Sequence, residues 1–100
     1  MKIVLNQTVV TPNGEKTKVE RDGVGYVAKK VTYSQIAYDY ISNKRTKTDP
    51  EASALYALLS KVKSEGEIDF TQDEFEVVKA AFDAQPVDIK GAFLELTGAV

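Results

Sequence analysis

The stretch Thr32-Tyr33-Ser34-Gln35-Ile36-Ala37-Tyr38-Asp39-Tyr40-Ile41 marks the place where the sequence changes from strand to helix. From Tyr33 onward its apolar residues recur at i, i+3, i+4, i+7 and i+8, which is the spacing of one face of an α-helix. Thr32 and Gln35 have the spacing of a capping box, in which two side chains bond the free N–H groups at a helix start. The stretch therefore predicts an amphipathic helix of about three turns that begins after Thr32.

Before this helix, residues 1–31 have the composition of short strands and turns. Residues 2–10 are rich in Val, Ile and Leu and predict one strand. Thr11-Pro12-Asn13-Gly14 predicts a tight turn, because proline fixes φ and Asn-Gly tolerates positive φ. Residues 15–20 alternate weakly and predict the exposed arm of a hairpin. A second turn at residues 21–25 precedes a third short strand within residues 26–31.

After this helix, the remaining sequence predicts further helices. Asp49-Pro50-Glu51 opens the first of them, with Asp49 as the N-cap and Pro50 at the first helical position. A brief extended piece at residues 68–70 precedes Thr71-Gln72-Asp73-Glu74, a second capping box. A last helix ends at Gly98. The expected fold class is α+β, a single domain of residues 1–100 with an N-terminal β hairpin (1–31) followed by three or four short packed helices (32–98).

Composition removes several classes of chemistry. The 100 residues include no Cys and no His, which excludes disulfides, Cys/His zinc sites, Cys nucleophiles and His-based acid–base catalysis. No apolar run is long enough for a membrane helix, and residues 1–6 lack the apolar stretch of a secretory signal. We therefore expect a cytoplasmic protein.

Charge is divided unevenly between the two halves of the chain. Residues 1–48 hold nine Lys/Arg and four Asp/Glu, whereas residues 49–100 hold four and eleven, within a net charge of −2. A basic half is compatible with nucleic-acid binding, and an acidic half with a basic partner. Alternatively, the two halves are solvated and pair partly with each other.

Three patterns suggest ligand chemistry, and each has a structural explanation. Gly23-Val24-Gly25-Tyr26-Val27-Ala28 has the spacing of a dinucleotide fingerprint, but no apolar strand precedes it, so the glycines are interpreted as turn residues. Residues 64–70 are similar to half of a calcium loop, but Lys61, Lys63 and Gln72 occupy three of its ligand positions. The acids at positions 69, 73, 74 and 76 suit the start of a helix. We therefore predict no cofactor, no metal and no enzymatic activity.

Two sets of residues are candidates for macromolecular contacts. Lys44, Arg45 and Lys47 form the one local basic cluster and are candidate phosphate contacts. The candidate protein interface consists of Tyr38, Ser53, Ala57 and Ser60. Tyr38 is expected to point away from the apolar face of its helix, and aromatic side chains are enriched at interfaces. The other three are small and uncharged, so we expect their helix to be covered on two sides, within the fold or at a homodimer contact.

The two ends of the chain carry a resemblance to a known group. Residues 1–6 leading to Asn13-Gly14-Glu15-Lys16, and residues 67–79 with Ile89-Lys90-Gly91 and Glu95-Leu96-Thr97-Gly98, resemble small accessory proteins of tailed bacteriophages and prophages. Residues 15–48 depart from that pattern. The resemblance transfers no catalytic residue and implies a small protein that acts by contact in a bacterial host. The expected function is a non-enzymatic protein-interaction module that binds a host or virion-assembly protein, or itself; the alternative is a nucleic-acid-binding accessory protein.

Overall fold

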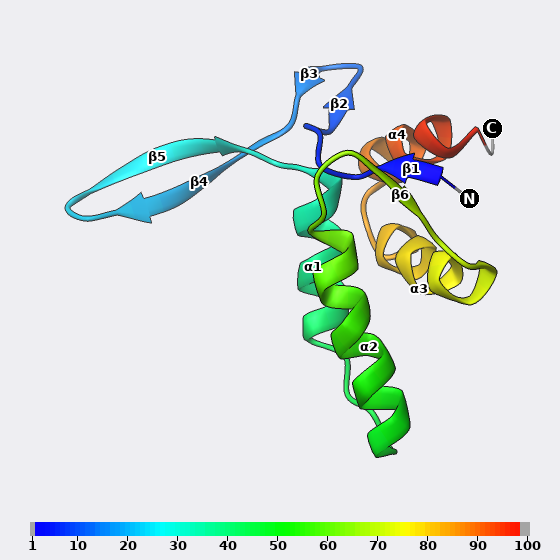
Figure 1. The fold of residues 1–100 in the computed structure, drawn as a ribbon. Coiled ribbons are helices and arrows are strands. Elements are labelled where there is room, and N and C mark those ends of the chain that lie inside the picture. Colours follow the sequence, from blue (N-terminus) through cyan, green and yellow to red (C-terminus); the bar gives the residue numbers. More distant parts are fainter. Residues whose placement is uncertain (1, 99–100) are drawn as a thin grey trace.

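The computed structural model describes residues 2–98 and arranges four helices around a short sheet, with one hairpin projecting from the body (Figure 1). The central sheet has two antiparallel strands, β1 (Lys2–Val4) and β6 (Glu67–Asp69), with Ile3 opposite Ile68. Both isoleucines are buried, so this strand pair lies on the hydrophobic core. The pairing joins the beginning of the chain to the segment between its second and third helices.

The strand predicted over residues 2–10 is wrong as one element. The chain bends after β1, where the N–H of Gln7 donates to the carbonyl of Leu5 at 2.8 Å, and strand structure resumes at β2 (Val10–Thr11). A continuous strand would place Gln7 on the same face as the buried Leu5 and Val9. The bend leaves the Gln7 side chain exposed while both neighbours reach the core.

The N-terminal region holds two hairpins instead of the single one predicted. β2 pairs with β3 (Gly14–Glu15) across the predicted Pro12-Asn13 turn. β4 (Thr17–Asp22) then pairs with β5 (Gly25–Lys30) over six residues each, around a turn in which Gly23 has φ of 58°. The predicted third strand therefore forms, and its partner is β4.

Four helices follow, which agrees with the predicted α+β class and its three or four helices. They are α1 (Tyr33–Ser42), α2 (Asp49–Val62), α3 (Gln72–Asp83) and α4 (Val87–Thr97). α1 packs against both α2 and α3, and α4 packs against α3 and β2. α1 and α2 form an antiparallel pair whose connection lies far from the sheet (Figure 1). Within residues 2–98, no helix combines the length and the apolar composition needed to cross a bilayer.

Helix starts follow the capping predictions in part. The Thr71–Glu74 capping box is confirmed by reciprocal bonds of 3.2 and 2.9 Å. Thr32 caps α1 as predicted, but the Gln35 side chain bonds Asp39 and Lys63 and so does not complete the box. The prediction that Asp49 caps α2 is wrong, because the preceding Thr48 side chain accepts from the backbone N–H three residues later.

Aromatic side chains fill the centre of the core. Phe82 and Phe93 are fully buried and stack with ring centroids 3.9 Å apart, which ties α3 to α4. Tyr33 of α1 lies against both rings at 5.9 and 6.4 Å. Burial raises the pKa of the Tyr33 hydroxyl. The buried Ser34 hydroxyl donates to the carbonyl of Val62 at 2.7 Å and so satisfies a free carbonyl at the end of α2.

Candidate interaction surfaces

The β4–β5 hairpin, hereafter the arm (residues 17–30), extends away from the helices (Figure 1). Its base is held by three backbone bonds that join Val9, Lys16 and Val31 at 2.8 to 2.9 Å. No residue from 12 to 32 belongs to the buried core. The arm is therefore fixed at its base and is in contact with solvent along its length.

The two faces of the arm differ in chemistry. Side chains opposite each other in an antiparallel pair share a face, and successive residues alternate between faces. One face carries the ion pairs of Glu20 with Lys18 and Lys29, both at 3.1 Å. These two ammonium groups lower the pKa of the Glu20 carboxyl. The charges on this face are thus largely paired within the arm.

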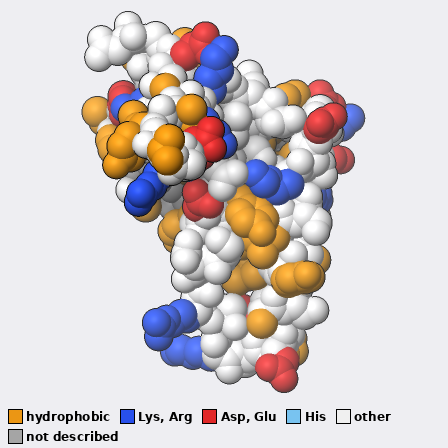
Figure 2. Space-filling view, turned by 90° about the vertical axis from the view of Figure 1, so that its left-hand side faces the viewer, with side chains coloured by type: hydrophobic (Ala, Val, Ile, Leu, Met, Phe, Trp, Pro, Cys, Tyr) orange, Lys and Arg blue, Asp and Glu red, His pale blue; other side chains and the backbone are white. Residues whose placement is uncertain are grey.

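The opposite face carries the Thr17–Lys30 pair at the base of the arm and, beyond it, Val19, Arg21, Tyr26 and Ala28, which are hereafter called the apolar arm face. Val19 is 70% exposed and Tyr26 is 74% exposed. Val24 extends the apolar surface at the tip and is fully exposed. Figure 2 looks towards this end of the molecule and shows hydrophobic side chains gathered there, at upper left. Nothing in the described part of the chain covers this face.

The interface candidates on α1 and α2 lie on the surface of the helix pair. Ser53, Ala57 and Ser60 are exposed, so the expectation that the fold itself covers this side of α2 is wrong. The cause is that, among residues 2–98, α1 is the one element that packs extensively against α2, and it covers a single side of that helix. Tyr38 is half-buried between the two helices, with the Lys63 ammonium 5.3 Å from its ring centroid. Tyr38 and Ser60 line one hollow of about 350 Å³.

The candidate phosphate contacts lie at the connection between α1 and α2. Lys44, Arg45 and Lys47 are all exposed there, and Figure 2 shows Lys and Arg side chains together at the lower end of the helix pair. The Lys44 ammonium lies 5.3 Å from the centroid of the Tyr40 ring. Lys29 and Lys30, which belong to the same basic half of the sequence, lie on the arm and pair with Glu20 and Glu15. The basic half therefore does not form one continuous surface.

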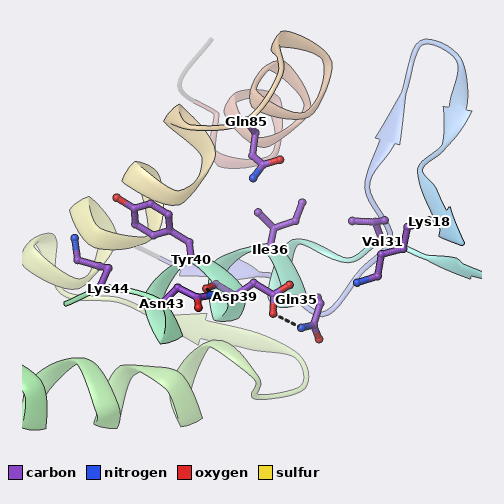
Figure 3. A pocket seen from close by; sticks show the side chains of 9 residues that line it. All are labelled: Lys18, Val31, Gln35, Ile36, Asp39, Tyr40, Asn43, Lys44 and Gln85. Carbon is purple, nitrogen blue, oxygen red and sulfur yellow. Dashed lines mark hydrogen bonds between the residues drawn. The ribbon is translucent and has the colours of Figure 1, made fainter. Parts of the chain in front are cut away.

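A hollow of about 520 Å³ lies beside α1, between the base of the arm and the α3–α4 connection (Figure 3). Asp39 is the one acidic residue that lines it, and its carboxylate accepts a 2.7 Å bond from Gln35. The Asn43 amide donates to the Asp39 carbonyl at 2.6 Å. Gln35, Asp39 and Asn43 are thus bonded to one another, and no pair of carboxylates for acid–base chemistry lines the hollow.

The acidic residues near the start of α3 serve the helix. Glu74 accepts from Lys61 at 2.6 Å and from the Thr71 backbone N–H at 2.9 Å. These bonds lower the pKa of the Glu74 carboxyl, the Lys61 contact contributing most. Among residues 2–98, no group of three or more acids gathers in a way that could hold a metal ion.

A second apolar surface lies between the β2–β3 turn and α4. It is a groove of about 760 Å³, hereafter the α4 groove. The residues that line the α4 groove are Val10, Thr11, Pro12, Val87, Asp88, Gly91, Ala92, Leu94 and Glu95. Val10 is 58% exposed and Val87 is 86% exposed. Lys16 bonds Asp88 at 3.1 Å and lowers the pKa of its carboxyl.

Sequence reasoning missed both apolar surfaces. The apolar arm face could have been predicted from the sequence, because Val19 and Tyr26 lie on either side of the Gly23 turn at positions that share one face of a hairpin. No local sequence pattern predicts the α4 groove, since Val10 and Leu94 are far apart along the chain. No protein-family model, curated protein or solved structure matches this chain.

Proposed function

We propose that this chain is a small non-enzymatic protein-interaction module of phage or prophage origin, acting in the cytoplasm of a bacterial host. It binds a host protein, a virion-assembly protein or a second copy of itself, and the arm is its contact element. The phage setting is supported by the resemblance at the two ends of the sequence. The role in binding is supported by the apolar arm face.

The exposure of that face is the observation that carries the proposal. Val19 and Tyr26 are more than two thirds exposed on a hairpin whose base is held by backbone bonds. Covering apolar surface is favourable by about 25 cal/mol per Å², so a partner that covers these side chains gains affinity. Tyrosine and arginine, which stand opposite each other on this face, are enriched among residues that dominate binding energy.

The test is a comparison of baits that differ at one exposed tyrosine. Tyr26 on the arm and Tyr56 on α2 are 74% and 75% exposed, so Tyr56→Ala is a matched control for Tyr26→Ala. Each bait is used in a pull-down from bacterial lysate that also contains the untagged chain, followed by mass spectrometry. We expect one protein to be retained by the wild type and by Tyr56→Ala, and lost with Tyr26→Ala. Equal capture by all three baits would refute the role of the arm.

Nucleic-acid binding is the second candidate, and the exposed cluster of Lys44, Arg45 and Lys47 supports it. Three cations acting together limit the slope of the logarithm of the binding constant against the logarithm of salt concentration to a magnitude of about three, because each phosphate contact contributes about 0.9. Fluorescence anisotropy with a duplex and a single strand at physiological salt tests this candidate. Submicromolar, sequence-selective binding would favour it over protein binding.

A further inference from the structure

We propose that the partner of the arm is a second copy of this chain, whose α4 groove receives the apolar arm face. This inference rests on the proposed function, because it takes the arm as the element that binds protein. It adds the identity of the partner and the place where the arm lies on it. The argument uses the position, length and charge of the two surfaces.

The position of the arm prevents it from filling the groove of its own chain. The arm leaves the body on the side opposite to α4 (Figure 1), and the bonds at Lys16 and Val31 hold its base in that direction. The α4 groove is built on the other side, where β2 packs against α4. Contact between the two surfaces therefore requires two molecules.

The arm and the groove match in length. Six residues per strand make the arm about 20 Å long. α4, which forms one wall of the groove, has eleven residues and is about 16 Å long. The apolar arm face can thus lie along most of the helix, with its valine and tyrosine side chains against Val10, Val87 and Leu94.

The charges of the two surfaces are complementary. Residues 17–30 hold four Lys/Arg and two Asp/Glu, which gives the arm a charge of +2, while the rest of the chain carries −4. Asp88 and Glu95 line the groove and no Lys or Arg lines it, but Asp88 is already paired with Lys16 at 3.1 Å, so Glu95 is the acid open to the arm. Within residues 2–98, Glu95 has no ion pair, and neither does Arg21 on the apolar arm face. Docking places this arginine near Glu95 and gives both groups an opposite charge.

The size of the contact predicts how strong it is. Stable interfaces bury about 1,200 Å² or more, and a strand pair about 20 Å long covers less than that on its own. One arm in one groove is therefore a weak contact, whereas two chains that exchange arms bury twice the area. We expect association in the micromolar range, detectable as a rise in mass with concentration.

The first experiment measures self-association by sedimentation velocity across a concentration series. We expect Tyr26→Ala to weaken it about tenfold or more, and Tyr56→Ala to leave it unchanged. Each variant is checked for native helix content by circular dichroism, and both substitutions are at exposed positions. Loss of association with Tyr56→Ala alone would show that the copies meet through α2, and would overturn the proposal.

The second experiment reverses the charges at the two surfaces. Arg21→Glu and Glu95→Arg should each weaken self-association, with Arg45→Glu on the α1–α2 connection as the control that does not. A mixture of the Arg21→Glu and Glu95→Arg chains should associate again, because each supplies the surface that the other lacks. A mixture no stronger than its components would overturn the arm-in-groove contact.

The outcomes separate this inference from the proposed function. A wild-type chain that stays monomeric up to about 1 mM overturns the inference. If Tyr26→Ala nevertheless abolishes capture of another protein from lysate, the arm remains a protein-binding element. If neither self-association nor capture depends on Tyr26, both proposals fail together.

Discussion

Removal of the arm should leave the body of the protein folded. The variant replaces residues 18–29 with Asn-Gly, so that Thr17 and Lys30, which face each other in the hairpin, are joined by a two-residue turn. Asn-Gly favours the type I′ turn that such a short connection requires. The backbone bonds between Lys16 and Val31 at the base of the arm are retained.

The expected change in stability follows from burial and from chain entropy. No residue removed belongs to the core, and Val19 and Tyr26 are more than two thirds exposed, so the loss of apolar burial is close to zero. A two-stranded hairpin is marginally stable by itself and adds little. Shortening the connection from twelve residues to two lowers its closure entropy by at most about 1.6 kcal/mol. The free energy of unfolding should therefore equal that of the wild type or exceed it by up to about 1.6 kcal/mol.

Urea denaturation, monitored by the helix signal in circular dichroism at about 222 nm, measures this difference, since all four helices lie outside the arm. The same experiment with Tyr26→Ala provides a variant that keeps the arm and loses its aromatic group. A decrease of about 2 kcal/mol or more on truncation would contradict the reasoning, because it would show that the arm stabilises the core.

Two further predictions concern the helices. Glu74→Gln should lower the free energy of unfolding at pH 7 by about 1 kcal/mol, because it weakens the bonds to Lys61 and to the backbone of Thr71. The folded-state pKa of Glu74 is lowered, so its contribution to stability is present above the ordinary carboxyl value of about 4.3 and is lost as pH falls through the folded pKa. Denaturation at pH 7 and at pH 3 should therefore show a smaller difference between variant and wild type at the lower pH. Ala57→Glu should change stability by no more than about 0.5 kcal/mol and leave the mass unchanged, since Ala57 is exposed. A shift in mass by light scattering would show that this side of α2 contacts a second copy.

Much of the helical region could be predicted from the sequence because its signals are local. The apolar spacing after Tyr33 and the capping box at Thr71 each act within one or two turns, and both elements form where they were expected. The errors in this region were shifts of about one residue. Thr48, not Asp49, caps α2, because either of two adjacent residues could accept the same N–H group and sequence order does not decide between them.

The candidate site was less predictable, because it depends on what covers each residue. Tyr38 was expected on an outward face, yet the position of α2 makes it half-buried. Ser53 and Ala57 were expected under cover within the fold or at a homodimer contact, and within the chain they are exposed. A helical pattern states which residues share a face, but the number of neighbouring helices determines how many faces are buried.

The sequence by itself determined that this is a small α+β chain with three or four helices at nearly their observed positions, and without the side chains for thiol or imidazole chemistry. Only the tertiary structure decided that β1 pairs with β6, that β5 is the partner of β4, and that Val10 meets α4. The physical reason is the range of the interactions. Helix periodicity and capping act between residues a few positions apart, whereas any strand can offer its backbone bonds to any other. The partner of a strand is selected by burial of the whole chain.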